Sequence, residues 1–125
     1  MPMVIDPILE IECEAIVQAI DVSSDGKWMA WGGEDGTVRI LDMSSTPKPI
    51  DPFNVEDSVT HVRFAYGDVI VVGTHTSDVY GHERLGGRRW THSVGGGCDL
   101  MDISNDGTLI ACIDGGRHVH IVTEN

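Results

Sequence analysis

Glycine-containing turns recur along this chain at nearly constant spacing, and that spacing constrains the fold more than any other feature. Gly26, Gly67 and Gly107 lie 41 and 40 residues apart, within the sequences SSDG, AYGD and SNDG. Each turn precedes a short apolar run (WMAWGG, VIVVGT and LIACID), and then a further turn and an alternating stretch (TVRILD, SDVYGH and HVHIVT). Each unit therefore predicts three short strands joined by turns, and no segment shows a sustained helical period.

Repeats of about 40 residues with this strand order are typical of β-propeller blades. The middle strand of a blade is covered on both faces, which explains why the second stretch of each unit is continuously apolar. The first unit, DVSSDGKWMAWGGEDGTVRILD, closely resembles a WD-repeat blade, with Leu41 and Asp42 where that family has Trp-Asp. The resemblance implies an all-β fold made of four-stranded antiparallel blades. It also implies a protein that presents its rim and flat faces to other proteins.

A second resemblance concerns the stretch HERLGGRRWTHSV, residues 82–94. It is similar to the linker of quinoprotein-type propellers through Gly86 and Trp90. His82 and Leu85 replace the residues that this family has at those positions, so a quinone-binding role is not implied and we expect no cofactor.

The units divide the chain into one half-propeller domain spanning residues 1–125. We expect a first blade over 15–56, a second over 59–94 and a third over 98–124, with outer strands at 50–56 and 89–94 in the first two. The short Asp-Gly turns are expected to be structural, because an aspartate carboxylate bonds nearby backbone amides and glycine tolerates a left-handed backbone. These turn residues are Asp25, Gly26, Asp35, Gly36, Asp106 and Gly107.

The third unit has no stretch that could serve as its outer strand, whereas the N-terminal region has a spare one. Residues 8–14, ILEIECE, alternate apolar and acidic side chains, which places Leu9, Ile11 and Cys13 on one face of a strand. Three blades are too few to close a propeller, which has about four to eight. We therefore expect residues 8–14 to complete the third blade of a second chain, giving a homodimeric ring of six blades.

The expected interface joins Leu9, Ile11 and Cys13 of one chain to Val119 and Ile121 of the other. Completion by a different propeller subunit, or an open arc docked on a larger assembly, are the alternatives.

The charge of the chain excludes some partners. The net charge is −12, with 20 acidic and 8 basic residues, which argues against binding a nucleic-acid backbone. An acidic, lysine-poor composition resembles that of proteins from salt-loving archaea and their viruses; a solvated acidic surface and a docking site for a basic partner are the alternatives. The sequence shows neither an apolar run of membrane-spanning length nor a signal peptide, so the expected location is the cytoplasm, or a virion if the protein is viral.

No residue pattern predicts catalysis or a metal site. Cys13, Cys98 and Cys112 form no CxxC motif and are expected to be free thiols. His118 and His120 share one strand face, but two ligands are fewer than a zinc site requires. We therefore expect a non-catalytic interaction or scaffold module that assembles with another copy or subunit. The alternative is an enzyme or metal-binding propeller whose site forms at an inter-chain central channel.

Residues of the expected channel lie on the first strand of each unit. Asp21 and Asp102 occupy equivalent positions, and His61 lies near the corresponding place in the second unit. They could form a polar ring that binds a cation or water, or simply line the channel.

Overall fold

The computed structural model describes residues 2–76 and 78–124, and every regular element within them is a β-strand. The first sheet contains β1 (Val17–Val22), β2 (Trp28–Gly33), β3 (Thr37–Asp42) and β4 (Lys48–Asn54). The second contains β5 (Val59–Phe64), β6 (Val69–Thr74), β7 (Asp78–Glu83) and β8 (Arg88–Ser93). The third contains β9 (Cys98–Ile103), β10 (Ile110–Asp114) and β11 (His118–Val122).

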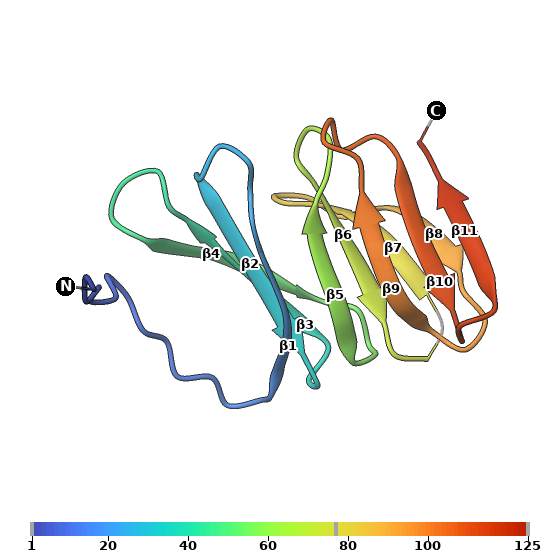
Figure 1. Cartoon of the computed structure of the whole chain (residues 1–125), viewed down its shortest axis with the longest axis horizontal. Coiled ribbons are helices and arrows are strands. Elements are labelled where there is room, and N and C mark those ends of the chain that lie inside the picture. Colours follow the sequence, from blue (N-terminus) through green and yellow to red (C-terminus); the bar gives the residue numbers. More distant parts are fainter. Residues whose placement is uncertain (1, 77, 125) are drawn as a thin grey trace.

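Each sheet is an antiparallel meander in which consecutive strands are neighbours (Figure 1). The prediction of an all-β chain is confirmed, with sheets of four, four and three strands among the described residues. The outer strands expected at 50–56 and 89–94 overlap the observed strands β4 and β8, with bounds that differ by one or two residues. The third sheet has no fourth strand within residues 98–124, and the assignment of the sheets as propeller blades stays a prediction.

The second sheet lies between the other two, and each of its faces contributes to a separate apolar core. Ile70 and Val72 of β6 pack with Ala30 and Ile40 of the first sheet. The alternate residues of β6, Val69 and Val71, pack instead with residues of the third sheet, including Ile110 and Cys112. All six residues of β6 are buried, because both of its faces are covered, as the continuous apolar sequence indicates.

The Asp-Gly turns have the geometry that short carboxylates favour. The carboxylates of Asp25, Asp35 and Asp106 each accept a hydrogen bond from the backbone N–H two residues later, at 2.9, 3.0 and 3.1 Å. The glycine that follows each aspartate has a positive φ, at 73°, 75° and 77°; these glycines are Gly26, Gly36 and Gly107.

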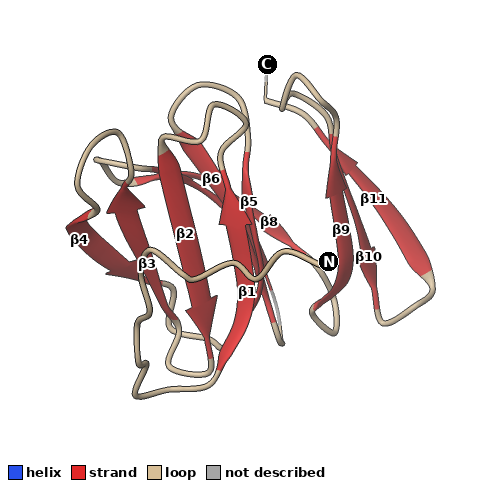
Figure 2. Ribbon diagram, turned by 60° about the vertical axis from the view of Figure 1, so that its left-hand side comes forward, coloured by secondary structure: helices blue, strands red, loops and turns tan. Residues whose placement is uncertain are grey.

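The N-terminal segment is unpaired in the single chain, and its expected pairing with a second chain stays a prediction. Residues 8–14 pair with no strand of this chain, and residues 2–16 contain no regular element. The segment instead crosses the outer face of the first sheet, as Figure 2 shows, where Leu9 and Ile11 line apolar grooves beside Trp31. An extended segment becomes a strand only beside a free backbone edge, and this face of the sheet offers side chains rather than an edge.

Candidate functional site: the open edge of the third sheet

The third sheet ends in an open edge at β11. In the first two sheets the third strand, β3 or β7, lies between two neighbours, because β4 or β8 covers its outer side. β11 occupies the same place in its own sheet but pairs only with β10 in the described part of the chain. Its outward backbone N–H and C=O groups therefore form an edge to which another strand can add.

The side chains of β11 on the outer face are equally uncovered. Val119 and Ile121 are 69% and 61% exposed. The residues at the same position as Val119 in the other sheets are Val38 and Val79, each facing the adjacent sheet with 0% exposure. The exposure at β11 therefore arises because no further sheet follows in the described chain. The chemistry of β11 itself suits a buried interface.

The expected interface residues lie at opposite ends of the molecule. Leu9 and Ile11 lie on the first sheet and Cys13 is exposed beside them, whereas Val119 and Ile121 lie on the third sheet (Figure 1). Within one chain these two groups do not meet. Their contact, if formed, is between chains, and this remains a prediction.

A chain of hydrogen bonds joins β11 to the rest of the protein on its inner face. His92 of β8 contacts His120 of β11 (Nε2 to Nδ1, 2.9 Å), and Nε2 of His120 contacts the carboxylate of Asp114 at 2.7 Å. The other oxygen of Asp114 accepts from the backbone N–H of His118 at 3.2 Å and lies 3.0 Å from Nδ1 of its ring. Asp114 is buried, and its hydrogen bonds from His120 and His118 hold its pKa below the usual value for an aspartate.

Asp114→Asn is expected to destabilise the protein at neutral pH, because the amide cannot replace the charge that both imidazoles face. A carboxylate with a lowered pKa stabilises the fold above the pKa of the unfolded state. This stabilisation is lost progressively as pH falls from the unfolded value through the lower folded one, so the melting temperatures of the two proteins should begin to converge below about pH 4. Thermal unfolding from pH 3 to 8 measures this, with the exposed Asp51→Asn as control. Equal melting temperatures of Asp114→Asn and the native chain at pH 7 would contradict it.

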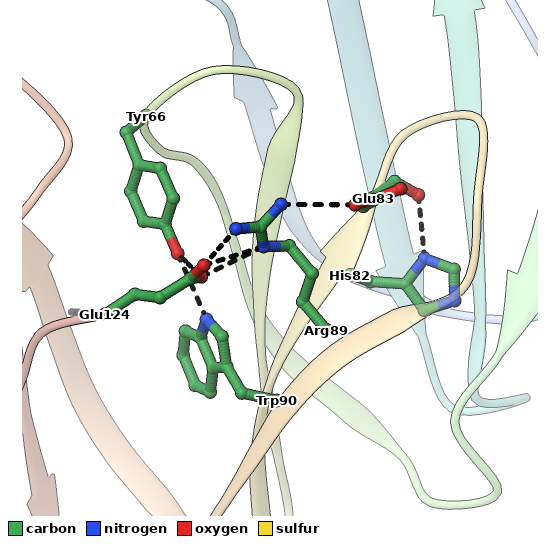
Figure 3. Close-up of polar contacts among 6 residues, drawn as sticks. All are labelled: Tyr66, His82, Glu83, Arg89, Trp90 and Glu124. Atoms are coloured by element: carbon green, nitrogen blue, oxygen red, sulfur yellow. Dashed lines mark hydrogen bonds and ion pairs between the residues drawn. The ribbon is translucent and has the colours of Figure 1, made fainter.

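A second polar cluster fastens the end of the third sheet to the second sheet (Figure 3). The guanidinium of Arg89 on β8 donates to the carboxylate of Glu124, with Nε 2.9 and 3.0 Å from its two oxygens, and to Glu83 at 3.2 Å. The hydroxyl of Tyr66 also donates to Glu124 and accepts from the indole N–H of Trp90 at 3.2 Å. Arg89 lowers the pKa of Glu124, so this carboxylate stays ionised across the neutral range. These hydrogen bonds join β8 and the loop before β6 to the segment after β11, which favours a structural role.

One of the three residues expected to line the channel, His61, does not lie at the predicted position. The position equivalent to Asp21 and Asp102 is occupied in the second sheet by Arg63, and not by His61. Arg63 lies between the two carboxylates, 3.8 Å from that of Asp21 and 3.4 Å from that of Asp102. Its positive charge offsets the negative potential that a bound cation would require, so this row favours a structural role.

His61 faces elsewhere, with its Nδ1 2.9 Å from the hydroxyl of Thr60, and burial lowers the pKa of its ring. The connection between β5 and β6 accounts for the difference from the prediction. Five residues separate the paired Phe64 and Ile70, whereas six separate Val22 from Met29 and Ile103 from Ile110. One residue fewer in the turn shifts the register of β5 by one position, which reverses the faces of its side chains.

The two buried cysteines lack the character of nucleophiles. Cys98 and Cys112 are buried, and Cys13 is exposed. Burial raises the pKa of Cys98 to about 12 and also raises that of Cys112, so both thiols stay protonated at neutral pH. Among residues 2–76 and 78–124, no three histidine, cysteine or acidic side chains are arranged to hold a metal ion.

Sequence comparison adds no family assignment. No family model matches the chain, and no curated protein matches it. In the part of the chain that the structure describes, no helix has the length and apolar character needed to span a membrane.

Proposed function

We propose that this protein is a non-catalytic assembly module, built from WD-like propeller blades, whose partner adds a β-strand to β11. The carrying observation is the open edge of β11 together with the exposed Val119 and Ile121, at positions that are buried in the other two sheets. An edge strand with apolar side chains binds a partner strand through its backbone and gains further free energy by burying those side chains.

The N-terminal segment of a second copy is suited to be that strand; another propeller subunit is the alternative. Four residues join the outer strand of one sheet to the first strand of the next, at 55–58 and at 94–97. The same crossover length before β1 places residues 13–16 in the connection and leaves the alternating residues up to Glu12 free to pair. The acidic side chains at positions 10 and 12 would then face solvent, and Leu9 and Ile11 the apolar side.

The outer faces of the first and third sheets, which no other sheet covers, favour association. A sheet face of this size exposes roughly several hundred Å² of apolar surface, which is more than a monomeric protein usually shows. At about 25 cal/mol per Å², burying both contributes on the order of 10 kcal/mol before the entropic cost of association. Each copy carries a net charge of −12, so two copies repel each other, and we expect salt to strengthen assembly by screening that repulsion.

Ile11→Asp in the full chain tests this proposal, with sedimentation equilibrium in high-salt buffer as the measurement. A carboxylate on the apolar face of the added strand removes burial worth about 2–3 kcal/mol at each of the two interfaces of the dimer. The dissociation constant should therefore rise by roughly 1,000-fold or more. Ile5→Asp is the matched control, because Ile5 is exposed and lies outside the grooves beside the first sheet.

A native chain that remains monomeric at all salt and protein concentrations would refute self-assembly. Equal effects of the substitutions at positions 11 and 5 would refute a specific role for the N-terminal strand.

A further inference from the structure

Equivalent positions build both of the interfaces between sheets inside the chain. Ala30 of β2 packs in one core with Ile70 of β6. The residue 41 positions after Ala30 is Val71 of β6. Val71 lies on the opposite face of β6 from Ile70 and packs in the second core with Ile110 of β10. The same surface of each sheet therefore meets the same opposite surface of the next sheet, twice in succession.

This repetition leaves two sheet faces without a neighbouring sheet, one at each end of the described chain. The position that continues the series Ala30, Val71 is Ala111 of β10, on the outer face of the third sheet. The position that precedes Ile70 in the opposite series is Met29 of β2, on the outer face of the first sheet.

Both outer faces are mostly apolar, with Asp102 on the third sheet and Arg39 on the first as charged members. On the third sheet the neighbours of Ala111 on this face include Leu100, Ile113, Val119 and Ile121. On the first sheet the neighbours of Met29 on this face include Ile20, Val22, Trp31 and Leu41. Leu100 and Ile20 are each 62% exposed, although Val62, which is equivalent to Ile20 in the second sheet, is 2% exposed.

We infer that these two outer faces form one further interface of the same kind, between two copies of this chain, and that residues 8–13 cover part of the first-sheet face until the second copy displaces them. The inference rests on the proposed function and deepens it in two ways: it specifies how the two faces fit together, and it assigns residues 8–13 the role of a cover that the second copy displaces. A second copy is the favoured occupant, because the chain itself shows twice that such surfaces fit each other. Two copies placed head to tail form two identical interfaces, which closes the pair.

The contact between residues 8–13 and the first sheet is suited to displacement. Leu9 and Ile11 remain exposed, at 41% and 45%, and apolar grooves of about 430 Å³ flank them. The indole N–H of Trp31 is buried there without a hydrogen-bond partner among the described residues, which is an unfavourable arrangement. Within the described chain no backbone hydrogen bond ties residues 2–15 to the sheet.

The point of release lies just before β1. The carbonyl of Ile16 accepts a hydrogen bond from the N–H of Glu34 at 3.0 Å, which fixes the chain at that residue, and residues 14–15 form a bend. A change of direction at this bend would move residues 8–13 away from Trp31 and the outer face of the first sheet, which the N-terminal loop crosses in Figure 2. The freed segment is then available to the β11 edge of the second copy, so one movement uncovers the face and supplies the strand.

A charge-pair test in the full chain addresses the face directly. Leu100→Lys and Ile20→Asp each place a charge at an exposed position, so each variant should still fold. Its circular dichroism spectrum should match that of the native chain. Each should raise the dimer dissociation constant at least tenfold by sedimentation equilibrium. The double variant should recover most of that loss, because the equivalent residues of the first internal interface, Ala19 and Val62, belong to the same core. Leu85→Lys is the control, since Leu85 is 74% exposed on the β7–β8 connection.

The alkylation rate of Cys13 independently reports the position of residues 8–13, because Cys13 is exposed whereas Cys98 and Cys112 are buried. This rate should fall severalfold as protein concentration rises through the dissociation constant of the native chain, and should stay constant in Leu100→Lys.

The outcomes separate the inference from the proposed function. A chain that never associates refutes the proposed self-assembly. A dimer that withstands Leu100→Lys and Ile20→Asp, or that the control disrupts equally, overturns the inference alone. A Cys13 rate that does not change while the native chain dimerises overturns the displacement of residues 8–13.

Discussion

Ile70→Ala should lower the free energy of unfolding by about 3 kcal/mol, within the range of about 2–5 kcal/mol for such changes in a packed core. Ile70 is 0% exposed in the centre of β6, where it faces the first sheet. Truncation removes apolar contacts on that side and leaves a cavity that the neighbouring strands cannot close, because they are fixed by pairing within their own sheets. Small domains have a total stability of about 5–15 kcal/mol, so the loss is a large fraction of it.

Urea unfolding followed by tryptophan fluorescence measures this effect, with Ile5→Ala as the matched control. Ile5 is 80% exposed, and its truncation should change stability by less than about 0.5 kcal/mol. An Ile70→Ala variant as stable as this control would mean that the interface between the first two sheets is not the packed core of the protein.

The sequence predicts the strands and their order well, because local signals specify them. Gly26 and Gly107 follow aspartates that form their own turns, and β6 is apolar throughout because both faces are covered. These features depend on residues close in the sequence. The same pattern of strands and turns then recurs about every 40 residues, so the number of strands in each sheet can be predicted from one unit.

The features that the sequence does not predict depend on residues far apart in the chain. The contact of His92 with His120 joins residues 28 positions apart, and the ion pair of Arg89 with Glu124 joins residues 35 apart. The only sequence signal for the contact of His92 with His120 is the spacing of His118 and His120, and two histidines at this spacing are common without any functional role. The position of residues 8–14 depends on which backbone edge is available to them, and that is a property of the assembly rather than of the segment.

Gly97→Ala should be among the most destabilising changes outside the core, and Gly96→Ala should isolate the reason. Both glycines have a left-handed backbone, with φ of 85° at Gly96 and 90° at Gly97. An L-residue in this conformation costs about 1–2 kcal/mol, so both variants should lose that much. A Cβ at Gly96 would meet no other atom within 4 Å, whereas at Gly97 it would collide with the backbone carbonyl oxygen of His75.

The collision cannot be relieved by a side-chain rotation, because the obstructing atom belongs to the backbone and the N–H of His75 is itself bonded to the carbonyl of Ser58 at 2.9 Å. Moving it shifts the chain where the second sheet passes into the third, which adds roughly 1–3 kcal/mol to the loss at Gly97. The difference between the two variants in urea unfolding therefore measures the close approach alone, since the conformational term is common to both. Equal losses at both positions would show that only the left-handed conformation requires glycine here, and that the two sheets can separate at this crossing without cost.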